Sequence, residues 1–277
     1  MKPELTLAYS PCPNDTFLFY HLVHQNLSNM FSIKEELHDV ENLNIAAETG
    51  VYDITKLSFF AYFFVMNEYK LLNCGSALGK GCGPILVKKK GKKISPPEGQ
   101  KILVPGLKTT ANLLLNIYLQ KNFEPIPIRY EMIIDKINRE DFSYGVIIHE
   151  ERFTFEERGL EKVVDLGEFW ESETGKPIPL GAIAIKKGIE TGLQKEFESA
   201  LRKSLKLAHK NPQDAKEYIL KNSQATSLDV VNSHIKLYVN KFTEEIGEEG
   251  REAVYFLLEK AAGIGLIKGS AKEIFLC

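Results

Sequence analysis

The sequence has little of what marks an exported, membrane-bound or nucleic-acid-binding protein. Its N-terminus is not followed by an apolar stretch long enough for a signal peptide, and no window of the 277 residues approaches a transmembrane span. The 35 basic and 37 acidic residues give a formal net charge of -2, so no basic excess favours a nucleic acid partner. These absences predict a cytoplasmic protein that binds neither membranes nor nucleic acid.

Motifs for metals and nucleotides are also missing. The four cysteines, Cys12, Cys74, Cys82 and Cys277, form no CxxC pair and no metal-ligand spacing, so we expect free thiols in a reducing compartment. The glycine-rich stretch at residues 79–83 is not a P-loop, because no Ser or Thr follows its lysine. It also precedes a strand, whereas a dinucleotide-binding motif opens a helix. We therefore expect no metal and no organic cofactor.

What the chain does contain is an alternation of short apolar runs with helical patterns. Such an alternation implies parallel βαβ units, and therefore an α/β protein. Helices are expected at residues 16–24, 40–49 and 110–120 and through most of the chain after residue 193. Strands are expected at residues 5–9, 31–37, 53–57, 101–104, 126–130, 144–148, 163–166 and 179–185.

A linker-like stretch near residue 90 interrupts this alternation and suggests that a second lobe is inserted into the first. We predict that residues 1–90 and 185–277 form lobe one and that residues 91–184 form lobe two. Two chain crossings between lobes make a hinge, and the cleft between them is the expected ligand site.

The loop after the first predicted strand is the most informative segment. Residues 10–17 (SPCPNDTF) lie at the carboxyl end of that strand, where open α/β sheets bind ligands. Two prolines stiffen the loop, which suits the wall of a small site, although a rigid turn without a ligand explains the pattern equally well. We expect Asn14 or Asp15 to cap the helix at Thr16. Cys12 precedes a helix N-terminus, which can lower a thiol pKa, but without a partner in sequence a structural thiol is preferred.

His149 is the candidate general base. It ends an apolar run typical of a buried parallel strand, so the imidazole is expected at the carboxyl end of the sheet. A neutral ring with a pKa near ~6.5 could take a proton at neutral pH, whereas the alternative is a partly buried histidine bonded to the backbone. Glu150 should point to the opposite face of the strand. Surface roles are expected for the other histidines, which are His21, His24, His38, His209 and His234.

Two strand-to-helix turns suit an anion or a polar ligand. Residues 105–111 combine backbone amides with hydroxyls at a helix N-terminus, where the helix dipole favours negative charge. Lys56–Ser58 repeats this design at the end of the third strand, and Asn44 could add an amide group. The alternative in each case is local, with Thr109 or Thr110 as the helix cap in one turn, and core packing with a capping serine in the other.

At these positions the chain resembles the 1,4-dihydroxy-6-naphthoate synthase family of menaquinone biosynthesis. The matching segments occur in the family's order and at similar spacing over nearly the whole chain. They are SPCPNDTF at 10–17, TKLS at 55–58, GxGxGP at 79–84, residues 105–111, IIHExRFT at 147–154, PLGAI at 179–183 and YVN at 238–240.

The resemblance implies a fold like that of the type II periplasmic binding proteins, in which the cleft between the lobes serves as an active site. It implies a cofactor-independent lyase that splits cyclic dehypoxanthinylfutalosine, a small carboxylate, into 1,4-dihydroxy-6-naphthoate and dihydroxyacetone. The family's catalytic base falls on His149. Its substrate-binding positions fall on Lys56, Leu57, Ser58, Thr110, Ala111 and Asn44.

Two other functions remain open on the same fold. One is a chorismate dehydratase-like lyase of the same pathway, but the SPCPND and IIHE segments favour the naphthoate synthase family over it. The other is a non-catalytic carboxylate-binding protein, which would be expected to carry a signal peptide. The sequence leaves the oligomeric state undetermined.

Overall fold

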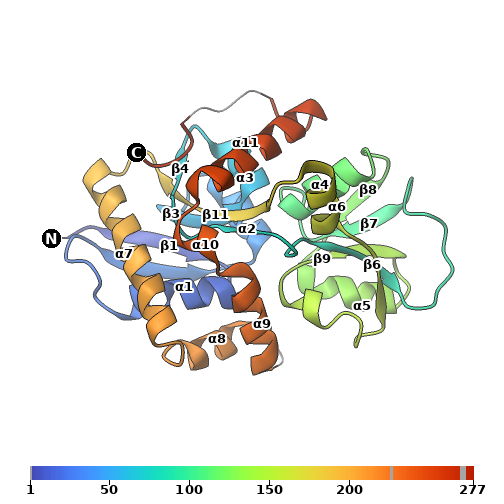
Figure 1. Ribbon diagram of the computed structural model, residues 1–277, viewed down its shortest axis with the longest axis horizontal. Helices are drawn as coiled ribbons and strands as arrows, with labels where there is room; N and C mark the ends of the chain where they lie inside the picture. Colours follow the sequence, from blue (N-terminus) through green and yellow to red (C-terminus); the bar gives the residue numbers. More distant parts are fainter. Residues whose placement is uncertain (1, 225–226, 269–272) are drawn as a thin grey trace.

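Two β-sheets, each covered by helices, form the protein in a computed structural model that describes residues 2–224, 227–268 and 273–277 (Figure 1). The first sheet has the order β2-β1-β3-β11-β4, and β5 also pairs with β11. Its strands are β1 (Glu4–Tyr9), β2 (Ser32–Leu37), β3 (Ile54–Ser58), β4 (Tyr69–Leu71), β5 (Ala77–Gly79) and β11 (Ile178–Lys186). The second sheet has the order β10-β6-β9-β7-β8, and its strands are β6 (Ile85–Lys89), β7 (Lys101–Val104), β8 (Glu124–Pro127), β9 (Tyr144–Ile147) and β10 (Leu160–Asp165).

Helices follow most of the strands and then make up most of the C-terminal third. They are α1 (Pro13–His24), α2 (Val40–Glu48), α3 (Phe59–Val65), α4 (Thr110–Tyr118), α5 (Ile133–Asn138), α6 (Leu166–Thr174), α7 (Thr191–Lys210), α8 (Lys216–Asn222), α9 (Leu228–Tyr238), α10 (Lys241–Glu244) and α11 (Gly247–Gly263), with 3-10 turns η1 (Tyr130–Met132) and η2 (His149–Phe153). Within the described ranges, no helix combines the length and apolar character that a membrane crossing requires.

The prediction of parallel strands holds for part of each sheet. Strand β1 runs parallel to β2 and β3, and β7 runs parallel to β8 and β9. The strands next to the two chain crossings do not follow this pattern, because β6 is antiparallel to its neighbours β9 and β10, and β11 is antiparallel to β3, β4 and β5. Both sheets are therefore mixed, and the expectation of uniformly parallel units was wrong for the strands that join them.

The whole second sheet lies between β5 and β11 in the sequence. The chain passes to it between β5 and β6 and returns between β10 and β11. The predicted boundary at residue 90 would leave β6 in lobe one, although β6 pairs with β9 and β10 in the second sheet. Similarly, most of β11 precedes the boundary at residue 185, although it pairs in the first sheet. The division into two lobes stays a prediction.

Helix α1 begins three residues earlier than predicted. Pro13 is its first residue and Cys12 occupies the N-cap position, so neither Asn14 nor Asp15 caps the helix. A proline suits the first helical position because its fixed φ is already helical and its missing N–H would have no partner there. The Cys12 carbonyl accepts hydrogen bonds from both the N–H and the hydroxyl of Thr16, at 3.0 and 2.9 Å.

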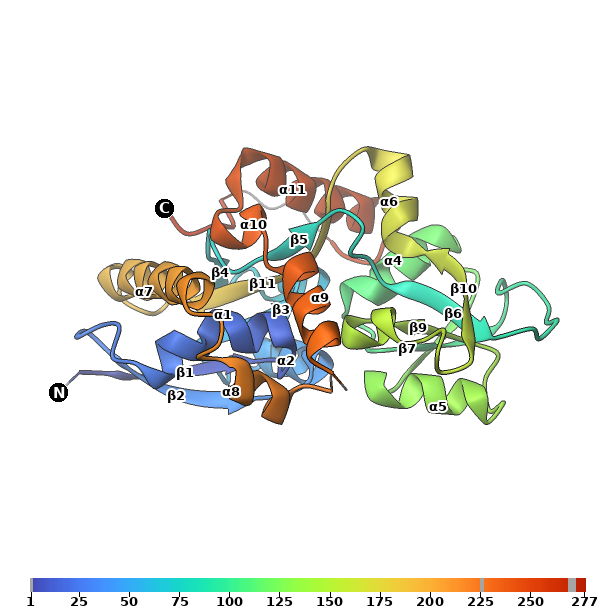
Figure 2. The ribbon, with the colours of Figure 1, turned by 60° about the horizontal axis from the view of Figure 1, so that its bottom comes forward.

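The two sheets bring four strand ends to one region. β1 and β3 are parallel neighbours in the first sheet, and β7 and β9 are parallel neighbours in the second. Because parallel strands end at the same edge, the loops that follow them lie together. We call the elements built around the first sheet the first half of the protein and those built around the second sheet the second half. Helix α9 packs against α1 and β5 of the first half and against η2 of the second half, and Figure 2 shows it between the two sheets. This arrangement positions the candidate site.

Candidate active site

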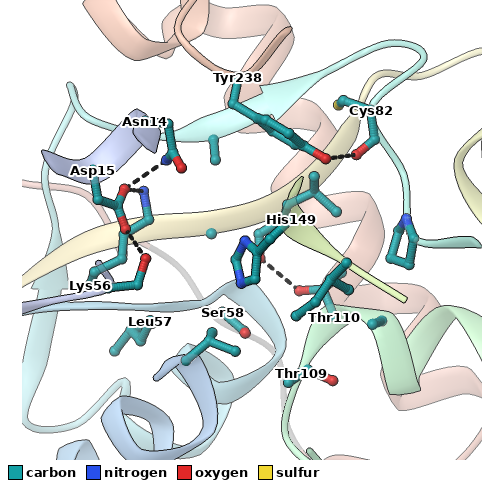
Figure 3. Close-up of a pocket in the computed structure, with 18 of the residues that line it drawn as sticks. Asn14, Asp15, Lys56, Leu57, Ser58, Cys82, Thr109, Thr110, His149 and Tyr238 are labelled. Atoms are coloured by element: carbon teal, nitrogen blue, oxygen red, sulfur yellow. Dashed lines mark hydrogen bonds and ion pairs between the residues drawn. The ribbon is translucent and has the colours of Figure 1, made fainter. Parts of the chain in front are cut away.

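A cavity of about 680 Å³, counting its part open to solvent, lies where these strand ends meet. This volume is within the range of small-molecule sites. Figure 3 shows His149 among side chains from both halves of the protein. The polar residues that line the cavity are Ser10, Asn14, Asp15, Lys56, Ser58, Thr109, Thr110, His149, His234 and Tyr238.

Six of the seven predicted site residues line this cavity, and Asn44 does not. The six are Lys56, Leu57, Ser58, Thr110, Ala111 and His149. Asn44 is fully buried behind Ser58, where its Oδ1 accepts from the Ser58 N–H at 2.9 Å and its Nδ2 donates to the Ser58 hydroxyl oxygen at 3.3 Å. Ser58 occupies the expected N-cap position of α3, but its side chain makes no capping bond to the helix. Asn44 instead fixes the orientation of a serine hydroxyl at the cavity wall.

Lys56 is held in a buried ion pair. Its Nζ lies 2.9 Å from Oδ1 of Asp15, and it also donates to the Gly75 carbonyl at 3.2 Å. Ser10 and Asn14 donate to the two carboxylate oxygens of Asp15, at 2.8 and 2.7 Å. The stiff loop after β1 thus provides the counter-charge for the lysine on β3. A buried charge requires such a partner, because an isolated one is strongly destabilising.

The first two residues of α4, Thr110 and Ala111, line the cavity. Thr109 caps the helix by accepting from the Asn112 N–H at 3.2 Å, and the Thr110 hydroxyl donates to the Leu180 carbonyl at 2.9 Å. Among the described residues, no acceptor receives the N–H of Thr110 or Ala111. The nine-residue helix therefore offers an anion two free donors at the positive end of its dipole. Capping and anion binding are compatible here, because they use different N–H groups.

His149 does not lie in a strand. Strand β9 ends at Ile147, and His149 opens the turn η2 with a φ of +56°, a left-handed conformation that is uncommon for a side chain other than glycine. Its ring lies edge-on to Tyr130, 5.0 Å between centroids, and its buried Nε2 has no hydrogen-bond partner within the described ranges. Burial lowers the pKa of His149 to about 4, below the ordinary value assumed from the sequence. The ring is therefore neutral at pH 7, as a base must be.

Glu150 lies beside His149, contrary to the expectation that it points to the opposite face. That expectation assumed strand alternation, which ends at Ile147. The Glu150 carboxyl is buried, and burial raises its pKa to about 7. Ligand atoms of Cys12, His149 and Glu150 all lie within 4.8 Å of one another.

These three groups could in principle hold a cation, but their environment works against it. Burial is the main reason that the pKa of the Cys12 thiol lies well above its ordinary value, which outweighs the neighbouring helix N-terminus and agrees with a structural thiol. A metal would have to displace protons from both the thiol and the Glu150 carboxyl in this buried setting.

Two other histidines are buried, although surface roles were expected for them. His21 on α1 packs in the first half and bonds Gln25 through its Nδ1 at 2.9 Å. His234 on α9 lines the cavity, with its ring centroid 6.4 Å from that of His149. A sequence signal for His234 did exist, because Val231, His234 and Tyr238 share one buried stripe of the helix.

With the geometry established, comparison with known proteins identifies the family. A family model described as menaquinone biosynthesis matches residues 5–263. A 1,4-dihydroxy-6-naphthoate synthase of Thermus thermophilus is 41% identical over 272 residues, which cover 98% of this chain and 99% of the relative. The chain belongs to the menaquinone biosynthesis family. The resemblance seen in the sequence is thereby confirmed.

The fold of this menaquinone biosynthesis family member is also found in solved structures. A protein from Archaeoglobus fulgidus has a TM-score of 0.90 at 34% identity, with 95% of this chain and 98% of that chain covered. The alkanesulfonate-binding protein of Xanthomonas axonopodis pv. citri has a TM-score of 0.74 at 11% identity, with 100% and 97% covered, and shares the fold alone. The predicted periplasmic-binding-protein-like α/β fold is confirmed. Such a fold, with this cavity, suits a small-molecule ligand.

Proposed function

We propose that this chain is a 1,4-dihydroxy-6-naphthoate synthase, a lyase that splits cyclic dehypoxanthinylfutalosine into 1,4-dihydroxy-6-naphthoate and dihydroxyacetone. One observation carries the proposal. In a member of the menaquinone biosynthesis family, the neutral imidazole of His149 shares a cavity with the free N–H groups at the start of α4. A base and an anion site in one small cavity suit proton removal from a bound carboxylate.

The substrate carboxylate binds at α4 in this proposal. The N–H groups of Thr110 and Ala111 hold it, and the Thr110 hydroxyl, bonded to Leu180, fixes the first turn of the helix. Burying the anion against a helix N-terminus stabilises it by typically about 0.3–1 kcal/mol from the dipole alone, before the two hydrogen bonds are counted. Lys56 adds a positive charge on the opposite wall, which Asp15 largely neutralises.

The hydroxylated ring of the substrate lies between the two walls. Ser58, oriented by Asn44, hydrogen-bonds it, and Leu57 contacts it through apolar surface. His149 then removes a proton and starts elimination and carbon–carbon cleavage. The step is favourable because an aromatic naphthalene ring forms.

We further propose that the two sheets belong to two lobes that close over the substrate. The cavity walls come from both sheets, and the chain crosses twice between them. Lobe closure about these crossings would exclude water from the charged intermediate and complete the site around it.

Conversion of cyclic dehypoxanthinylfutalosine by the purified protein is the direct test. We expect 1,4-dihydroxy-6-naphthoate and dihydroxyacetone in equal amounts, detected by mass spectrometry, without added metal or cofactor. Chorismate serves as the parallel substrate. Dehydration of chorismate would instead assign the related lyase function, and binding of either compound without product would point to a non-catalytic binding protein.

The pH dependence of kcat/KM should report the lowered pKa of His149. The active form is the neutral ring, and its fraction falls as the pH falls through the pKa of the folded protein, about 4, instead of 6.5. We therefore expect kcat/KM to hold from pH 7 down to roughly pH 5 and to fall below it. An acid limb centred near pH 6.5 would contradict the lowered pKa of His149. Glu150→Gln is the control, because a limb near pH 7 that disappears in this variant belongs to Glu150.

A further inference from the structure

His234 is a polar side chain whose burial has no structural explanation among the described residues. Its exposed fraction is 0%, and in the part of the chain that the structure describes neither Nδ1 nor Nε2 has a hydrogen-bond partner. Buried polar groups are almost always paired, because an unpaired one costs free energy comparable to a lost hydrogen bond. The other fully buried histidine, His21, bonds Gln25 through its Nδ1 and lacks a partner only at Nε2 among the described residues, whereas His234 lacks one at both nitrogens. An unpaired ring at a cavity wall therefore suggests a partner that occupies the cavity.

The position of His234 places it beside the base. Its ring centroid is 6.4 Å from that of His149, and the two ring planes are inclined by 31°. This spacing is too wide for a direct hydrogen bond between the rings, but both can reach neighbouring atoms of one ligand. Tyr238 and Phe153 fix the other side of the His234 ring, at centroid distances of 4.5 and 6.2 Å. The ring is thus held by packing at the cavity wall, with both of its nitrogens buried and, among the described residues, unpaired.

We propose that His234 is a second catalytic imidazole, which donates a hydrogen bond from a ring N–H to the substrate oxygen that gains negative charge when His149 removes the proton. The inference rests on the proposed function and extends it. A donor preorganised at the site of developing charge stabilises the transition state more than the ground state. The proton of His234 stays on its nitrogen, so His149 alone takes up and returns the transferred proton.

The electrostatics of the pair suit this division of roles. Burial lowers the pKa of His234 well below its ordinary value, and the neighbouring His149 lowers it further. His234 is therefore neutral and carries one N–H. A protonated His149 disfavours a second positive charge 6.4 Å away, so His234 stays neutral throughout the reaction.

Three substitutions of His234 test the proposal. His234→Phe keeps an aromatic ring between Tyr238 and Phe153 but removes both nitrogens. His234→Gln keeps an N–H donor at about the position of Nε2, and His234→Asn keeps one at about the position of Nδ1. We expect His234→Phe to lower kcat by about 10²–10³-fold, as loss of one preorganised donor typically does, with KM within about threefold. The better of the two amide variants should recover at least about tenfold of that loss.

His21→Phe is the matched control, because it also replaces a fully buried histidine but lies outside the cavity. We expect its kcat to stay within about twofold of wild type, and thermal unfolding shows whether each variant is folded. A folded His234→Phe variant with wild-type kcat would overturn the inference, as would amide variants that lose as much as phenylalanine does. A wild-type protein that yields no naphthoate would instead defeat the proposed function itself.

Discussion

Replacement of His149 by alanine is expected to lower kcat by about 10²–10⁴-fold, the usual contribution of a positioned general base. The binding groups lie on other elements, because the free N–H groups belong to α4 and the oriented hydroxyl belongs to Ser58 on β3. The affinity for 1,4-dihydroxy-6-naphthoate should therefore change by less than about tenfold. Steady-state kinetics and product binding, measured on the same preparation, separate the two effects.

The backbone at His149 calls for a second variant. Its left-handed φ of +56° is strained for alanine, whereas asparagine adopts this conformation more readily. His149→Asn should therefore be at least as stable as His149→Ala while remaining equally inactive. His209→Ala, at an exposed position outside the cavity, is the control for loss of an imidazole. If His149→Asn retained wild-type turnover, another group would have to be the base.

The sequence predicted the parts of the site that depend on where strands end. Lys56–Ser58 forms the carboxyl end of β3, and residues 105–111 follow β7. Because parallel strands in one sheet end at the same edge, local patterns were enough to place these segments near the cavity. The alternation of strands and helices likewise indicated the α/β class. The antiparallel course of β6 and β11 depends on which sheet each strand joins, and no local pattern encodes that choice.

The neighbours of the base were beyond this kind of prediction. Placing Glu150 away from His149 required β9 to continue one residue further than it does, and the left-handed turn at His149 instead brings the two side chains together. His234 lies 85 positions further along the chain than His149, on a helix with an apolar stripe. The sequence pattern of such a stripe is the same whether the stripe faces a core or a cavity. Contacts of this range come from tertiary packing, which periodicity does not report.

Replacement of Lys56 by methionine should have the largest effect on stability. The Lys56 and Asp15 side chains are 8% and 2% exposed, so the substitution leaves a carboxylate buried without its counter-charge. Breaking a buried ion pair in this way costs about 3–5 kcal/mol of unfolding free energy. The hydrogen bonds from Ser10 and Asn14 remain and favour the lower end of that range. Chemical denaturation monitored by circular dichroism measures the loss.

A matched surface pair shows whether burial is the cause. Lys34 and Glu36 have the same 2.9 Å separation, but their side chains are 58% and 30% exposed, so Lys34→Met should cost less than about 1 kcal/mol. An equal loss in the two methionine variants would contradict the argument from burial.

The double variant Lys56→Met/Asp15→Asn separates the two roles of the lysine. It removes both charges, so most of the stability lost in Lys56→Met should return. Substrate binding should not return with it, because the ammonium group at the cavity wall is still missing. We therefore expect a folded double variant with a raised KM for cyclic dehypoxanthinylfutalosine. A double variant with wild-type KM would mean that Lys56 serves only to neutralise Asp15, and that the substrate is held by α4 and Ser58 alone.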